Sequence, residues 1–277
     1  DTVSPGVTGT VTAKAEVSEN LSSAGNCPRR FCLAGGSASI RMTTAPALWE
    51  ASWVAEHHSP LTMEAWRGVE TQHIAATLRL VDNNAEQDLL ESLLDSSKPP
   101  YPPKADNLPY LLSTPFRYRP QQASRFRRAH ESGLWYGAAS VYAVCAELAY
   151  WRMRFVQDSA GLVKTEVLTQ HTLFQATVQG EAIDLTAKPW TQAHTIWAHP
   201  SDYTGSHALG ALIRDQDTVQ WIRYESVRAP GHLCAAVFSP HALRMNDLRE
   251  SEQRWFCKTT AQHVLMSDGT QSFEWTE

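Results

Sequence analysis

The sequence lacks the features that direct a chain to a membrane, to nucleic acid or into the disulfide-rich class. No apolar run approaches the roughly 20 residues that a membrane-spanning helix needs. The 24 Lys and Arg are outnumbered by 29 Asp and Glu, so no basic excess favours binding to phosphate backbones. The five cysteines are scattered and odd in number, which is not a disulfide framework. We therefore expect a cytoplasmic globular protein that binds neither nucleic acid nor a membrane.

Motifs for metals and common nucleotide sites are also missing. The 11 histidines include no His-Glu-x-x-His, and Cys27 and Cys32 are not followed by a second cysteine pair, so no metal site is predicted. Gly-x-Gly-x-x-Gly, the P-loop and Gly-x-Ser-x-Gly are absent as well. The sequence therefore gives no support for a bound cofactor or for a serine hydrolase.

Composition divides the chain into three parts. Residues 1–41 contain no Trp, Tyr or His, whereas all 10 tryptophans follow them. Burial of so little apolar surface does not offset the conformational entropy lost on ordering. We therefore predict that residues 1–41 are a poorly ordered extension, or sequence upstream of a natural start at Met42. The alternative is a small accessory strand region near residues 8–13. Residues 42–105 are predicted to be a helical lead-in and Pro-rich linker, and residues 106–277 the catalytic domain.

The lead-in is expected to be helical because apolar residues recur at three- and four-residue spacings from Met63 onward. A second short helix is expected over 89–94, before the prolines that begin at Pro99. The main domain mixes both periods. It should contain a helix after Ser140, a helix over 207–213 and strands over 165–168, 172–178, 219–224, 233–238 and the C-terminal hairpin. Without a regular βαβ repeat, the predicted class is α+β, with a mixed sheet and flanking helices.

Chemistry is concentrated between residues 114 and 154. Five arginines, at 117, 119, 125, 127 and 128, fall within twelve residues of an otherwise acidic protein. Their guanidinium forks match phosphate oxygens, so the cluster is a candidate diphosphate clamp, although a solvated basic loop has the same composition. Glu147 lies within an apolar helix, where carboxylates are rarely left without a partner. It is either a structural ion pair or an active-site carboxylate.

Two further residues are weaker candidates on their own. Tyr136 follows Trp135 in a predicted strand and could stack on a flat ring or form a hydrogen bond through its hydroxyl. Ser226 follows another strand and is flanked by Arg223 and Arg228, a place where small-molecule sites form, and equally where turn serines occur.

Taken in order, these segments resemble the RES domain family, named for an arginine, a glutamate and a serine. The resemblance covers about residues 60–240 and includes the Lys98-Pro-Pro element. It is carried by residues 114–119 (TPFRYR), 124–126 (SRF), 134–138 (LWYGA), 146–152 (AELAYWR), 183–186 (IDLT) and 223–228 (RYESVR).

The resemblance implies a fold similar to ADP-ribosyltransferase toxins, and the toxin half of a bacterial toxin–antitoxin pair. Members of the family degrade NAD+ by phosphorolysis or hydrolysis, so NAD+ is the implied substrate, inorganic phosphate the co-substrate in the first case, and no cofactor is needed. The implied catalytic residues are Arg125, Tyr136, Glu147 and Ser226. The implied substrate-binding residues are Arg117, Tyr118 and Arg228.

The sequence leaves several alternatives open. The same site could transfer ADP-ribose to a macromolecule or metabolite, or the domain could be a catalytically silent module that binds a partner. Arg127 rivals Arg125 as the leading arginine. The implied partner is an antitoxin of the helix-turn-helix Xre type.

Overall fold

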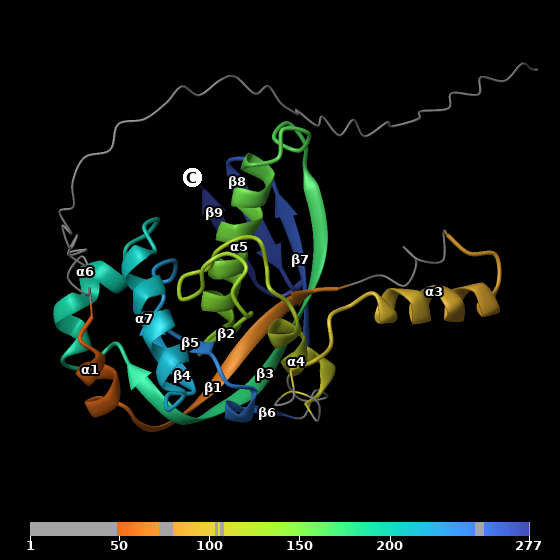
Figure 1. The fold of residues 1–277 in the computed structure, drawn as a ribbon. Coiled ribbons are helices and arrows are strands. Elements are labelled where there is room, and N and C mark those ends of the chain that lie inside the picture. Colours follow the sequence, from red (N-terminus) through yellow and green to blue (C-terminus); the bar gives the residue numbers. More distant parts are fainter. Residues whose placement is uncertain (1–48, 72–79, 103–104, 106–107, 247–251, 277) are drawn as a thin grey trace, which may run out of the picture. The chain divides into compact units, whose positions relative to one another are not determined.

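The protein was analysed as a computed structural model, which describes residues 49–71, 80–102, 105, 108–246 and 252–276. Helices and strands are interspersed along the chain without a βαβ repeat, and the strands form a mixed sheet. This confirms the predicted α+β class (Figure 1). The helices are α1 (Ala51–Glu56), α3 (Asn84–Ser96), α4 (Tyr110–Arg117), α5 (Val141–Gln157), η2 (Trp190–Ala193), α6 (His194–Trp197), α7 (Thr204–Gln216) and η3 (Pro240–Ala242). The strands are β1 (Ser59–Glu70), β2 (Trp135–Ala138), β3 (Val167–Asp184), β4 (Trp221–Glu225), β5 (Leu233–Val237), β6 (Leu243–Met245), β7 (Gln253–Thr259), β8 (His263–Ser267) and β9 (Ser272–Thr276).

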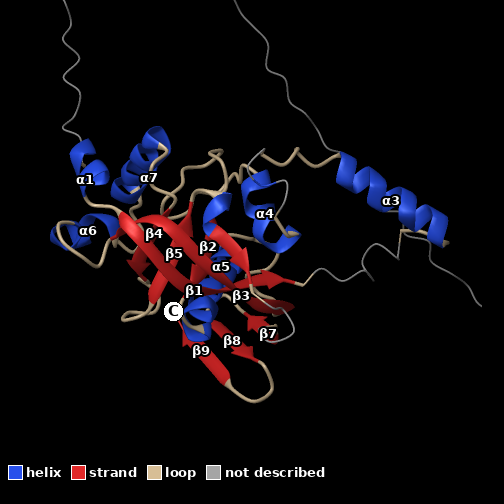
Figure 2. Cartoon of the chain, turned by 90° about the horizontal axis from the view of Figure 1, so that it is seen from below, coloured by secondary structure: helices blue, strands red, loops and turns tan. Residues whose placement is uncertain are grey.

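Five strands of the sheet close into a ring. Their order is β1-β2-β5-β4-β3, and β3 pairs in turn with β1 along the whole of that strand, from Ser59↔Ala182 to Glu70↔His171. Of the other four strands, β7, β8 and β9 extend the sheet from the first half of β3 (Figure 2), and the short β6 pairs with β3 at residues 176–178. By contrast, β1 and β2 are joined at one residue pair, Trp66↔Ala138. The ring is therefore firmly closed on the β3 side of β1 and loosely closed on the β2 side.

The prediction of a helix starting at Met63 is wrong as far as the structure describes that segment. Residues 63–70 belong to β1, and the rest of the expected helix, residues 72–79, lies outside the described residues. Met63 and Ala65 alternate inward along β1, so a period of two competes with the three- and four-residue spacing. Gly68 further disfavours a helix, and pairing with β3 decides the outcome. The second expected helix is confirmed as α3.

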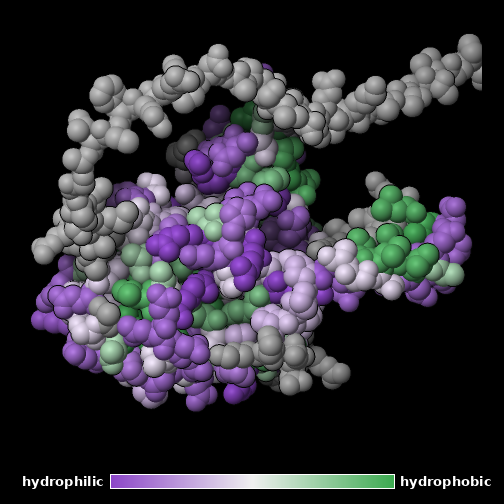
Figure 3. Space-filling view, in the orientation of Figure 1, coloured by the Kyte–Doolittle hydropathy of each residue, from purple (hydrophilic) through white to green (hydrophobic). Residues whose placement is uncertain are grey.

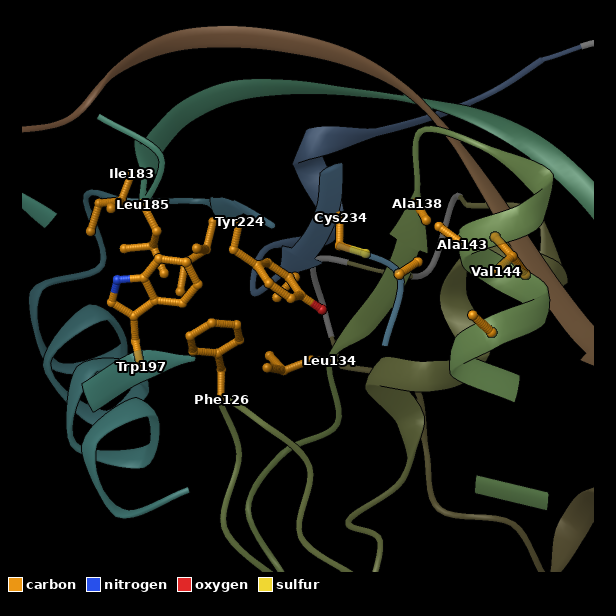
Figure 4. Packing of buried hydrophobic residues seen from close by; sticks show 14 of the residues in the cluster. Phe126, Leu134, Ala138, Ala143, Val144, Ile183, Leu185, Trp197, Tyr224 and Cys234 are labelled. Atoms are coloured by element: carbon orange, nitrogen blue, oxygen red, sulfur yellow. The ribbon is translucent and has the colours of Figure 1, made fainter. Parts of the chain in front are cut away.

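Two cores lie on opposite faces of the ring. One is inside it and includes Ala65, Trp135, Phe174 and Trp221. The other lies between the outer face, α5, α6 and α7, where Phe126 packs edge-on against Tyr224 with ring centroids 5.0 Å apart (Figure 4). This second core anchors the segment that carries the arginine cluster.

The main-domain predictions are largely confirmed. Ser140 caps α5 by accepting a hydrogen bond from the backbone N–H of Ala143, as its sequence position indicates. The helix over 207–213 is the centre of α7, and the C-terminal hairpin is β8–β9. One correction concerns 165–168 and 172–178, which were expected as separate strands. Residues 167–168 and 172–178 belong to the single strand β3, because β1 and β7 pair across the polar residues between them, whereas 165 and 166 precede the strand.

The helix α3 has no buried residue, and its exposed leucines form an apolar surface (Figure 3). Among the helices that the structure describes, none combines the length and hydrophobicity needed to cross a membrane. Residues 1–41, predicted to be a poorly ordered extension, lie outside the described residues.

Candidate active site

Residues of β1, β2 and α5 line a cavity of about 220 Å³, which we call the central cavity. Three of the predicted site residues line it: Arg125, Tyr136 and Glu147. They come from a turn, a strand and a helix that are adjacent only in the folded chain. Trp66 and Arg67 of β1 and Tyr224 of β4 are among its other lining residues. The structure thus brings together residues that the sequence separates by more than 150 positions.

Glu147 is supplied by α5 and is held by Ser226. The Ser226 hydroxyl donates to Glu147 Oε1 at 2.7 Å and accepts from the backbone N–H groups of Arg228 and Ala229, at 3.1 and 3.0 Å. No described cation lies within ion-pair distance of the carboxylate, so the structural ion pair considered above does not form. Ser226 is buried and does not line the cavity. Its hydroxyl therefore contacts Glu147 from outside the cavity lining.

Tyr136 forms part of the cavity wall, and its hydroxyl is bound within the protein. The phenol oxygen accepts from the backbone N–H of Phe126 at 3.3 Å and lies 2.9 Å from Ser124 Oγ. Burial raises the pKa of this phenol, while its hydrogen bonds oppose that shift. The hydroxyl therefore stays protonated near neutral pH and ties β2 to the turn that carries Arg125. The ring is the part of Tyr136 that a ligand can contact.

Arg125 sits in a tight two-residue turn closed by hydrogen bonds between Ser124 and Arg127, at 2.9 and 3.0 Å. Its guanidinium donates to the carbonyl oxygens of Trp197 and His199 at 3.0 and 2.9 Å, and stacks over the Tyr203 ring at 4.9 Å. These contacts hold the side chain in place without neutralising its charge. Arg125 is therefore a buried cation that can attract an anionic ligand into the cavity.

A second cation, Arg67, was missed by sequence reasoning. Beside the single pair that joins β1 to β2, the Arg67 guanidinium donates to the carbonyl oxygen of Tyr136 at 2.8 Å and lies over Trp135 at 5.5 Å. Its Nε is buried without a hydrogen-bond partner, and burial lowers its pKa to about 10. It still carries a charge at neutral pH, and no described carboxylate pairs with it.

In the sequence, Arg67 is a single arginine within an expected helix, and nothing near it indicates that it lines a cavity. Only the alternation of Met63 and Ala65 places Arg67 on the inward face of a strand.

The three predicted substrate-binding residues do not line the central cavity. Arg117 binds the Pro99 carbonyl and Asp95 and stacks on Tyr101 at 4.3 Å, because it ends α4 facing the proline-rich segment. Arg228 donates to the Pro200 carbonyl and stacks on Tyr150.

Tyr118 lines a neighbouring space of about 570 Å³, which we call the seam cavity and which shares Arg67, Ser124 and Tyr136 with the central one. Tyr118 therefore stays a candidate for contact with a ligand that extends beyond the central cavity.

The rival arginine, Arg127, is used structurally. Its guanidinium donates to the carbonyl oxygens of Pro120, Gln122 and Arg128, so it fastens the loop onto itself. Arg128 is exposed and pairs with Glu131. Of the clustered arginines, Arg125 is the one that lines the central cavity.

The central cavity thus combines two unneutralised cations with one carboxylate. Such a site suits a ligand that has anionic oxygens at one place and positive charge at another. Among the described residues, no group of three or more His, Cys, Asp and Glu side chains is placed to hold a metal ion.

Comparison with known proteins was made at three levels. A family model described as RES domain matches residues 99–257, more than half of the 277-residue chain. One chain of the crystal structure of the M. tuberculosis MbcT–MbcA toxin–antitoxin complex is similar, with 12% identity and a TM-score of 0.44. That match covers 84% of this chain and 93% of the other. A search of curated proteins finds no match.

Proposed function

The chain belongs to the RES domain family, and we propose that it is a toxin that degrades NAD+ by cleaving the bond between nicotinamide and ribose. One observation carries the proposal: Arg67, Arg125 and Glu147 line one cavity, and none is neutralised by a described residue of opposite charge. NAD+ has the complementary charges, an anionic diphosphate and a cationic nicotinamide ring. The two arginines would bind the diphosphate, and the carboxylate would lie beside the positively charged part of the substrate.

Glu147 would act on charge that moves during the reaction. When the C–N bond breaks, its electron pair neutralises the nicotinamide, and positive charge passes to the ribose as an oxocarbenium-like centre. A carboxylate fixed by Ser226 stabilises that centre without having to reorganise. Arg67 and Arg125 would hold the diphosphate, and the Tyr136 ring would form the wall against which the nicotinamide ribose lies.

The acceptor completes the balance of atoms. In hydrolysis, a water oxygen bonds to the ribose carbon and releases one proton, giving ADP-ribose and nicotinamide. In phosphorolysis, a phosphate oxygen forms that bond, giving ADP-ribose phosphate. Transfer of ADP-ribose to a protein or metabolite is the alternative proposal, since it uses the same bond cleavage and differs in the acceptor alone.

Product analysis tests the proposal. Purified protein is incubated with NAD+ labelled in the adenosine part, with and without inorganic phosphate and with a cell extract, and products are separated by chromatography and identified by mass. Free ADP-ribose indicates a glycohydrolase, ADP-ribose phosphate a phosphorylase, and label on extract components a transferase. No loss of NAD+ in any arm would contradict the enzyme proposal and favour a partner-binding module.

As an intracellular toxin, the protein would need an antitoxin, for which the family resemblance suggests a helix-turn-helix protein of the Xre type. Co-expression of the chain with the protein encoded beside it should restore growth and NAD+ levels if that protein is the antitoxin. Growth arrest that persists with both proteins present would argue against this partner.

A further inference from the structure

A third space adjoins the central cavity along α5. It has a volume of about 710 Å³, shares Ser124, Trp151 and Tyr203 with the central cavity, and we call it the aromatic cavity. Four rings line it: Tyr150, Trp151, Phe155 and Tyr203. Two of them, Trp151 and Phe155, are 41% and 51% exposed although they are large and apolar. Their spacing of four residues places both on the same face of α5.

The rings differ in which faces are already covered. Arg228 lies over Tyr150 at 3.5 Å, Arg125 over Tyr203 at 4.9 Å and Arg152 over Phe155 at 5.6 Å. Trp151 meets Tyr150 edge-on, with centroids 5.2 Å apart, and no described guanidinium covers its ring. Trp151 therefore offers a ring that no described guanidinium covers, and it lines both cavities.

The size of the central cavity indicates why a ligand would extend to this ring. At about 220 Å³ it lies below the usual range for small-molecule sites, roughly 300–1,000 Å³, so a dinucleotide cannot fit inside it. Arg125, the expected diphosphate contact, stacks on Tyr203, and Tyr203 lines both spaces. A ligand whose diphosphate lies on Arg125 is thus led towards the aromatic cavity.

We propose that the aromatic cavity binds the purine base of the substrate, with Trp151 as the main stacking surface and Phe155 as a second contact. This inference rests on the proposed function, because it assigns the second half of the same substrate. It makes Trp151 a specificity residue, which selects a dinucleotide over a nicotinamide mononucleotide.

The test compares two substrates that share the scissile bond. NAD+ contains the purine, whereas nicotinamide mononucleotide does not. Removal of base–aromatic stacking corresponds to about a tenfold to hundredfold loss of affinity. In Trp151→Ala, the ratio of kcat/KM for NAD+ to that for the mononucleotide should fall by about that factor, mainly through a higher KM for NAD+. Trp151→Phe should recover most of the ratio, and Phe155→Ala should lower it by a smaller factor.

Phe256→Ala is the matched control. Phe256 is 59% exposed on β7 and lines none of the three cavities, so its loss should leave the ratio as in the unmodified protein. The rival base site is the seam cavity, lined by Tyr110. If Tyr110→Ala lowers the ratio and Trp151→Ala does not, the base lies in the seam cavity and the inference is overturned.

A binding arm separates the inference from the proposed function. Calorimetry with ADP-ribose and with ribose 5-phosphate needs no turnover. Loss of ADP-ribose affinity in Trp151→Ala, in a protein that does not consume NAD+, would support the base site and overturn the NAD+-cleavage proposal. If the unmodified protein consumes NAD+ and Trp151→Ala binds ADP-ribose as tightly as the unmodified protein, the NAD+-cleavage proposal stands and the base site is overturned.

Discussion

Glu147 combines half-burial with a charge that no described cation neutralises, and this defines the first prediction. Glu147→Gln keeps the shape and can still accept from Ser226, but it removes the charge that the proposed function places beside the ribose. We expect NAD+ turnover to fall about 100- to 1,000-fold, the usual cost of losing one such electrostatic contact. Glu166→Gln, at an exposed ion pair with Lys258, is the control. Unchanged turnover by folded Glu147→Gln protein would remove the carboxylate from the mechanism.

The arginine cluster gives the second prediction, because its members have different partners. Arg125→Ala should raise the KM for NAD+ by about tenfold or more, since a charge-assisted contact contributes about 1.5–3 kcal/mol. Arg127→Ala should lower the free energy of unfolding, because three carbonyl oxygens lose their donor. Arg128→Ala should change neither. Steady-state kinetics and urea unfolding of the three variants test this, and a KM effect confined to Arg127→Ala would show that the leading arginine is misassigned.

At the scale of single residues, the sequence was informative where a residue type is unusual for its surroundings. A carboxylate in an apolar helix and a dense group of arginines both stand out locally, and both Glu147 and Arg125 line the central cavity. The role of Arg67 depends on how β1 pairs, and that depends on strands far along the chain. The sequence could place Ser226 after a strand and near the candidate site. It could not show that the Ser226 hydroxyl contacts Glu147, because that contact depends on how α5 packs.

Gly210 shows how closely two elements approach around the site. A Cβ at this position of α7 would lie 2.2 Å from the carbonyl oxygen of Phe126, in the turn that carries Arg125. Gly210→Ala should therefore cost about 1–3 kcal/mol of stability and raise the KM for NAD+ as the turn shifts. Gly161→Ala is the control, since open space surrounds that position. Unfolding in urea measures the first effect, and equal stability of the two variants would contradict the close approach.

His171 predicts how the pairing of β3 responds to acid. Burial, aided by the nearby Arg152 charge, lowers its pKa to about 4 from 6.5. Between these values the unfolded chain binds the proton and the folded chain does not, so stability falls as pH drops from 6.5 towards 4 and the loss levels off below. The difference corresponds to about 3 kcal/mol. His171→Phe should flatten the dependence measured by urea unfolding, whereas exposed His241→Phe should not.

The elements themselves were predictable where the local pattern agrees with the final packing. The Ser140 cap and the apolar face that follows it identify α5, and β-branched runs identify most strands. The segment that became β1 satisfies two periods, and local sequence cannot choose between them. The choice is made by β3, about a hundred residues later, which supplies its hydrogen-bonding partner.

For the whole molecule, composition predicts that residues 1–41 are dispensable. They contribute no tryptophan, tyrosine or histidine, whereas the rest of the chain carries all 10 tryptophans. A chain that begins at Met42 should keep the melting temperature and NAD+ turnover of the full chain. A marked loss of either would show that the segment packs on the remainder and would refute the prediction.

The way the ring closes also determines when the central cavity is complete during synthesis of the chain. The central cavity draws its walls from Trp66 through Cys234, and β1 finds its main partner only when β3 has left the ribosome. Contacts this distant in sequence form late and slowly. A nascent or prematurely terminated chain that ends before β5 holds Arg67, Arg125 and Glu147 but has no complete cavity to gather them. If the proposed NAD+ cleavage takes place in this cavity, no copy of the protein has a complete site until β5 has emerged.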